Sequence, residues 1–86
     1  WGTYLTCEET TDNYFDPSQP QTGYGWVVEI DPLGQIIQPT KRTAMGRFDH
    51  ENVDFLQAAD NRIAFYMGDD STPGCIYKFV PTNPVN

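Results

Sequence analysis

Carboxylate side chains occur in three short runs, each at the end of an expected strand or just after one, and the first run also carries a thiol. Calcium takes about six to eight oxygen ligands, many of them from carboxylates. A thiolate is a softer ligand that favours iron, copper or zinc. A cluster that mixes cysteine with carboxylates could therefore hold a transition metal beside calcium. The candidate metal ligands are Cys7, Glu8, Glu9, Glu51, Asp69 and Asp70.

Simpler interpretations of the same residues stay open. The acids also fit solvated turns, and Cys7 also fits a buried thiol or one half of a disulfide with Cys75. The chain has no calcium loop of the EF-hand type, and its single histidine, His50, cannot form a histidine-rich zinc site. We expect His50 to orient Glu51, and Arg47 to pair with a nearby acid rather than with phosphate.

No nucleophilic triad is indicated. Ser18 and Ser71 both lie in loops that lack the G-x-S-x-G pattern of a nucleophile elbow. The sequence therefore predicts metal ligands but names no catalytic side chain.

The charge balance excludes one class of partner. The 86 residues carry a net charge of −7, with twelve acidic residues against five basic ones. Nucleic-acid binding needs a basic face that neutralises phosphates, so we expect no nucleic-acid partner. We expect no membrane partner either, because no apolar run approaches the roughly 18 residues that span a bilayer.

The pattern of short apolar runs and turn signals predicts an all-β chain. Seven Gly, seven Pro and an aromatic fraction of 14% favour strands and turns. The strongest strand is expected at residues 62–67, another at 53–56, a long loop at 10–24 and a further loop at 68–74. The only helix candidate, residues 50–58, is weak. The other expected strands are residues 2–7, 25–30, 35–38, 41–48 and 75–80.

Strands of this length and spacing are typical of an antiparallel meander, as in a sandwich, barrel or propeller. Strand ends on one rim of a meander lie close together. We therefore expect the three acidic runs to converge on one site.

Five motifs, in matching order, resemble the PhoX-type alkaline phosphatases. They cover nearly all of this chain, which corresponds to a minor part of a full family member. The motifs are WGTYLTCEE at residues 1–9, GWVVEIDP at 25–32, KRTAMGRFDHE at 41–51, YMGDD at 66–70 and IYKFV at 76–80.

The resemblance implies a fold and a function. Residues 1–86 would be part of a β-propeller phosphatase domain, about one to two blades of antiparallel meander, cut at both ends. The parent would be a secreted or periplasmic phosphomonoesterase that scavenges phosphate by releasing it from small-molecule phosphate esters. Its cofactors would be iron and calcium in a central cluster. The 86 residues alone would be inactive, and no sequence signal indicates an oligomeric state.

Residue by residue, the resemblance matches Cys7 to the family's iron-binding cysteine, and Glu51 is the next expected ligand. Asp70, and then Asp69, Glu8 and Glu9, are further candidates. Cys75 stands where many family members have an aromatic residue, which favours separate roles for the two cysteines over a bridge.

Three alternatives remain. A non-catalytic calcium-binding propeller would share the acids but would not need Cys7. A calcium-dependent propeller esterase or lactonase would use a similar acidic rim on carboxyl esters. A disulfide-linked β domain would have no site.

Overall fold

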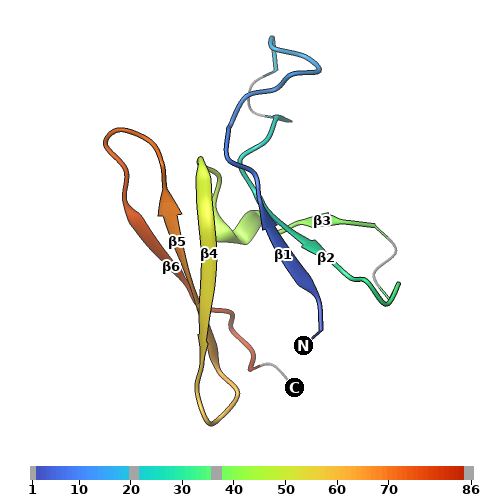
Figure 1. Ribbon diagram of the computed structural model, residues 1–86, viewed down its shortest axis with the longest axis vertical. Coiled ribbons are helices and arrows are strands. Elements are labelled where there is room, and N and C mark those ends of the chain that lie inside the picture. Colours follow the sequence, from blue (N-terminus) through green and yellow to red (C-terminus); the bar gives the residue numbers. More distant parts are fainter. Residues whose placement is uncertain (1, 20–21, 36–37, 85–86) are drawn as a thin grey trace.

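The computed structural model describes residues 2–19, 22–35 and 38–84, and these form two three-stranded antiparallel sheets (Figure 1). The first sheet has the order β1 (Tyr4–Cys7), β2 (Val27–Ile30) and β3 (Thr40–Lys41). Because consecutive strands pair in this sheet and in the second one, the predicted all-β antiparallel meander is confirmed.

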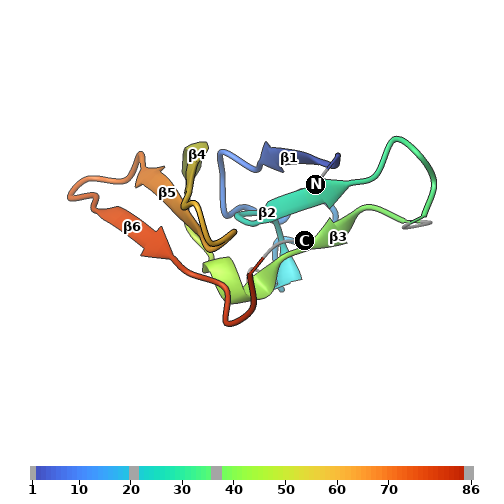
Figure 2. The same ribbon diagram turned by 90° about the horizontal axis from the view of Figure 1, so that it is seen from below.

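The second sheet has the order β4 (His50–Gln57), β5 (Ile63–Asp69) and β6 (Ile76–Phe79). A short 3₁₀ helix, η2 (Thr43–Met45), connects the two sheets. The sheets stand side by side at an angle, with β1 next to β4 in the middle and β3 and β6 at the outer edges (Figures 1 and 2).

The core lies between the sheets and follows from strand alternation. In β5 every second side chain is buried, namely Ile63, Phe65 and Met67. Val27 of β2 and Met45 of η2 complete this buried cluster. Partly buried side chains from both sheets pack against it, and these are Leu5, Cys7, Phe48, Val53 and Phe79.

The strand expected at residues 41–48 is wrong beyond its first residue. After Lys41 the chain turns into η2, where the Met45 amide donates to the Arg42 carbonyl oxygen at 3.0 Å and the Gly46 amide donates to that of Thr43 at 3.1 Å. The turn buries Met45, and Gly46 follows with φ +93°, a conformation that glycine adopts without strain. Burial of Met45 therefore outweighs the local strand pattern.

Two other expectations are corrected at β4 and β5. The weak helix candidate at residues 50–58 is wrong, because this segment is β4, which pairs with β5 along its length. The loop expected from residue 68 begins later, since β5 continues through Asp69. Part of the strand expected at 35–38 lies outside the described residues, as does Trp1, and Gln35 and Gln38 themselves lie in bends.

Candidate functional site

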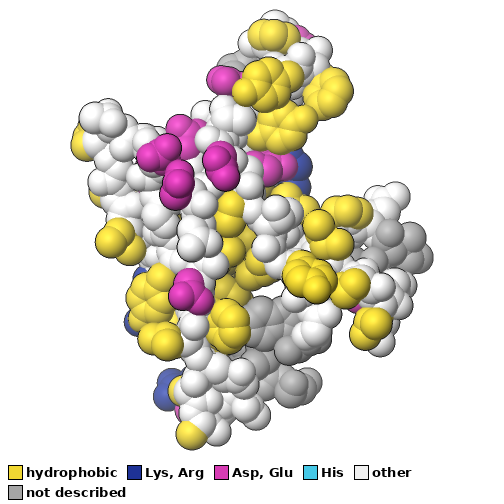
Figure 3. All heavy atoms as spheres, in the orientation of Figure 1, with side chains coloured by type: hydrophobic (Ala, Val, Ile, Leu, Met, Phe, Trp, Pro, Cys, Tyr) yellow, Lys and Arg dark blue, Asp and Glu magenta, His cyan; other side chains and the backbone are white. Residues whose placement is uncertain are grey.

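The ends of three strands meet at one edge of the molecule. The His50 amide, at the start of β4, donates to the carbonyl oxygen of Glu8, just after β1, at 3.1 Å. His50 also lies opposite Asp69 at the end of β5, and the Asp70 amide donates to the Asp49 carbonyl oxygen at 3.1 Å. Acidic side chains gather over this region (Figure 3). We call it the acidic rim and define it by the six candidate ligands, Cys7, Glu8, Glu9, Glu51, Asp69 and Asp70.

Cys7 is partly buried, because alternation in β1 turns it, like Leu5, toward the core. Burial raises the pKa of the Cys7 thiol, and the negative charge of Glu9 raises it further. Both effects disfavour the thiolate as long as no cation is near. A bound metal would reverse that preference, since a coordinating thiol is deprotonated. The surroundings of Cys7 thus suit a ligand that becomes anionic only with its metal.

Glu51 lies at an irregularity in β4. The register between β4 and β5 shifts by one residue between His50 and Asn52. Such bulges are common next to functional sites, because the extra residue re-aims a side chain and interrupts pairing. Glu51 is exposed, which leaves its carboxylate open to a ligand.

His50 is fully buried and is an anchor of the rim. Its Nε2 lies 3.0 Å from the Gly46 carbonyl oxygen, which can only accept, so Nε2 carries the proton. The ring stacks on Phe48 with centroids 3.7 Å apart. Its Nδ1 is buried and has no hydrogen-bond partner in the described part of the chain. The expectation that the His50 side chain hydrogen-bonds and orients Glu51 is therefore wrong within the described residues, because the ring bonds the Gly46 carbonyl oxygen and its other nitrogen has no partner there.

Asp69 and Asp70 lie in different surroundings. Asp69 Oδ1 accepts the Ser71 amide hydrogen at 3.0 Å, and hydrogen bonds from the Ser71 side chain and backbone lower the pKa of Asp69. Asp69 is therefore ionised over a wider pH range than an ordinary carboxyl group, while its exposed neighbour Asp70 faces solvent.

Glu8 is held by protein groups. Its Oε2 accepts the amide hydrogens of Gly25 at 2.9 Å and Trp26 at 3.0 Å, and its Oε1 lies 3.1 Å from Lys41 Nζ. The Glu8 side chain is 16% exposed. No local sequence signal predicts the contact of Lys41 with Glu8, because the two residues are 33 positions apart.

Arg47 binds the segment that precedes β2 through hydrogen bonds to backbone carbonyl oxygens. We expected an acidic partner, but its guanidinium donates to the carbonyl oxygens of Tyr24 at 2.9 Å and Thr11 at 2.7 Å. It also lies over the Trp26 ring, 5.9 Å from the centroid. Arg47 therefore closes the base of the long loop that precedes β2.

Carboxylates are donors that suit calcium and a thiolate is a donor that suits a transition metal, but the described side chains of the three acidic runs do not converge on one metal site as expected. Within residues 2–19, 22–35 and 38–84, no three side chains of His, Cys, Asp or Glu approach closely enough to hold an ion by themselves. Any metal at the rim therefore needs further donors.

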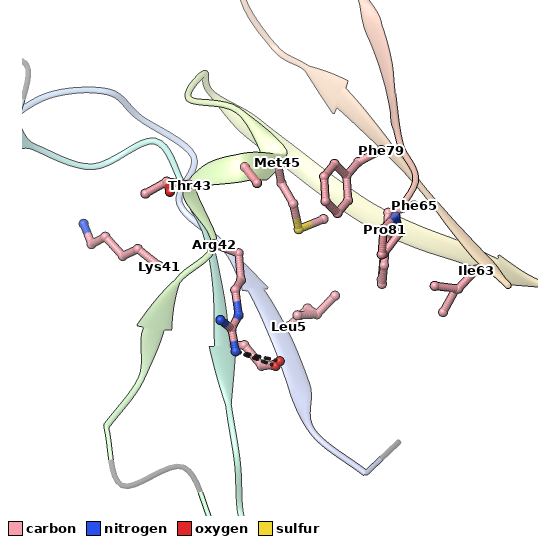
Figure 4. A pocket seen from close by; sticks show the side chains of 11 residues that line it. Leu5, Lys41, Arg42, Thr43, Met45, Ile63, Phe65, Phe79 and Pro81 are labelled. Carbon is pink, nitrogen blue, oxygen red and sulfur yellow. Dashed lines mark hydrogen bonds and ion pairs between the residues drawn. The ribbon is translucent and has the colours of Figure 1, made fainter. Parts of the chain in front are cut away.

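A cavity of about 490 Å³ lies away from the rim, between the two sheets (Figure 4). It is lined mainly by apolar side chains, including Leu5, Ile63 and Phe79, and the Arg42–Glu29 ion pair at 3.3 Å flanks it. Ile63 begins β5, whereas the rim lies at the opposite end of that strand. None of the six candidate ligands lines this cavity, so it is not the candidate site.

Cys7 and Cys75 are both free thiols, so the disulfide-linked alternative has no bridge between them. Within the described residues, no helix is long and apolar enough to cross a membrane.

Comparison with known proteins gives two matches. The sequence profile of a family described as alkaline phosphatase PhoX matches residues 1–86. A solved structure, Pseudomonas fluorescens PhoX in complex with vanadate, a transition state analogue, is similar with a TM-score of 0.76 and 37% sequence identity. The similarity covers 100% of this chain and 21% of that one, so the chain spans about a fifth of its length. No match is found among curated proteins.

Proposed function

The chain belongs to the PhoX alkaline phosphatase family, and on this premise we propose that it is part of a metal-dependent phosphomonoesterase that releases inorganic phosphate from small-molecule phosphate esters. The observation that carries the proposal is the meeting of three strand ends at the acidic rim, within a chain that matches the family over its whole length. The similar structure contains vanadate, described as a transition state analogue, which supports the same reaction class.

The 86 residues form part of a longer domain in this proposal. The similar chain is about five times longer, since the match covers 21% of it. The two sheets side by side would be about one to two blades of a β-propeller, whose other parts would complete the metal site. The isolated 86 residues would then lack phosphatase activity.

Cys7 would bind iron, and Glu51, Asp70, Asp69 and Glu9 would supply carboxylates to iron and calcium. Bound cations of this kind supply Lewis-acid stabilisation of phosphoryl oxygens and of the leaving group. The chain's own contribution would be to hold the donors. Burial and β1 alternation fix Cys7, the register shift in β4 frees Glu51, and Ser71 holds Asp69 ionised.

The phosphatase would work in the periplasm or outside the cell, where it would scavenge phosphate. Support comes from family membership.

Hydrolysis of a chromogenic phosphate monoester by the full-length protein tests this function. We expect turnover that is lost on chelation and restored by iron with calcium, no turnover by the 86 residues alone, and no hydrolysis of the matching carboxyl ester. Hydrolysis of the carboxyl ester alone would indicate the esterase or lactonase instead. Calcium binding without hydrolysis of either ester would indicate a structural propeller.

A further inference from the structure

Glu8 and Glu9 are chemically identical neighbours, yet their surroundings differ. Glu8 accepts two backbone N–H groups, from Gly25 and Trp26, and pairs with the Lys41 ammonium group at 3.1 Å. Glu9 is exposed, and its charge acts on the Cys7 thiol. The side chain of Glu8 is therefore committed to the protein, whereas that of Glu9 is open toward the rim.

The groups around Glu8 leave little capacity for a metal ion. Hydrogen bonds from N–H donors to a carboxylate are charge-assisted and strong. Both Glu8 oxygens are engaged, since Lys41 Nζ lies 3.1 Å from Oε1 and 3.3 Å from Oε2. A metal ion at this carboxylate would have to displace a cation that is already there. Lys41 is held independently, because its Nζ also donates to the Gly23 carbonyl oxygen at 3.4 Å and lies 5.1 Å from the Tyr24 ring centroid.

Glu8 also joins the two sheets. Its backbone carbonyl oxygen accepts the His50 amide hydrogen, one residue before Glu51, while its side chain fixes the segment that enters β2. The Gly25 carbonyl oxygen in turn accepts the Phe48 amide hydrogen at 3.0 Å. The strand end that carries Cys7 is therefore tied to the strand start that carries Glu51 by contacts that pass through Glu8.

We propose that Glu8 is a positioning residue and not a metal ligand: its contacts with Lys41 and with the amides of Gly25 and Trp26 fix the end of β1, so that Cys7 and Glu9 are presented to the rim. The role proposed for Glu8 rests on the function proposed above for the rim. The contacts of Glu8 do not depend on that function.

Glu8→Gln in the full-length protein tests the role, with Lys41→Met as its counterpart. The matched control is Glu29→Gln, because Glu29 is equally exposed at 16%, lies on the same sheet and also pairs with a cation, Arg42. Iron and calcium content, the absorption band of the iron–thiolate bond and, after chelation, the alkylation rate of Cys7 are measured in each variant.

We expect Glu8→Gln to keep the iron and calcium content of the wild type, to shift the iron–thiolate band, and to speed alkylation of Cys7 by about tenfold, which corresponds to the loss of one charge-assisted hydrogen bond. Lys41→Met should also speed alkylation of Cys7. The double variant should show less than the sum of the two effects, because both residues belong to one contact. The control Glu29→Gln should match the wild type.

Loss of a metal equivalent in Glu8→Gln, with full content in Lys41→Met, would make Glu8 a ligand and overturn the proposal. Unchanged alkylation of Cys7 in Glu8→Gln would also overturn it. A wild-type protein without iron and calcium would instead contradict the proposed function, while the alkylation rates would still decide whether Glu8 fixes the end of β1.

Discussion

Removal of the His50 ring is expected to destabilise the protein substantially, because that ring is the most enclosed polar group at the rim. It is 0% exposed, stacks on Phe48 and donates from Nε2 to the Gly46 carbonyl oxygen. His50→Ala removes all three features, while the backbone bond from the His50 amide to Glu8 remains.

The magnitude follows from three contributions. Deletion of a buried ring costs about 3 kcal/mol, and loss of the bond to Gly46 costs about 1 kcal/mol more. Removal of the buried Nδ1, which has no hydrogen-bond partner among the described residues, offsets this loss of stability by about 1–2 kcal/mol. The net loss in the free energy of unfolding is about 2–3 kcal/mol.

Urea unfolding of the full-length protein, followed by tryptophan fluorescence, measures this loss. With a slope of about 1–3 kcal/mol per molar urea, the midpoint should fall by about 0.7–3 M. The control is Leu56→Ala, which changes a 67% exposed position of the same strand and should shift the free energy by less than about 0.5 kcal/mol. If His50→Ala cost no more than this control, His50 would not be the buried anchor described above.

Three further predictions concern the core, the loop base and the thiols. Met67→Ala, which truncates a side chain only 2% exposed, should lower the free energy of unfolding by about 2–5 kcal/mol, as measured by urea unfolding. Gly25→Ala forces a side chain into a backbone with φ +109° that is already crowded, so calorimetry should show a lower melting temperature, and an unchanged one would contradict the crowding. In chelated protein, iodoacetamide should modify the exposed Cys75 before Cys7, because burial and Glu9 raise the pKa of Cys7, and equal rates at neutral pH by peptide mass spectrometry would refute this. Because the pKa of Cys7 is raised in the folded protein, folding favours the protonated thiol. The stability that this preference contributes is present below the pKa of the unfolded thiol and is lost as the pH rises through the raised pKa of the folded protein.

The strands were largely predictable, since their signals are local. Alternation of Ile63, Phe65 and Met67 between turn signals identifies β5. The strand at β2 was expected from its apolar run before a Pro and Gly turn, although its alternation is imperfect and Val27 and Val28 are both buried. The turn at η2 was not predictable in this way. Its residues fit a strand as well as a helix, and the outcome depends on the burial of Met45 in a core built from both sheets.

The meeting of the strand ends was also predictable, because a meander brings alternate strand ends to one edge. The different roles of the neighbouring acids Glu8 and Glu9 were not predictable from the sequence. Glu8 and Glu9 are identical in type, and what distinguishes them is contact with groups 17 to 33 positions away. The irregularity at Glu51 likewise depends on pairing with β5 and leaves no mark in the local sequence.

Metal content of the full-length protein, measured by elemental analysis alongside Cys7→Ala and the matched control Cys75→Ala, tests the central claim most directly. We expect iron with calcium in the wild type and in Cys75→Ala, and loss of iron in Cys7→Ala. Calcium alone in all three proteins, or iron unchanged in Cys7→Ala, would contradict the claim that the acidic rim is part of an iron–calcium phosphatase site.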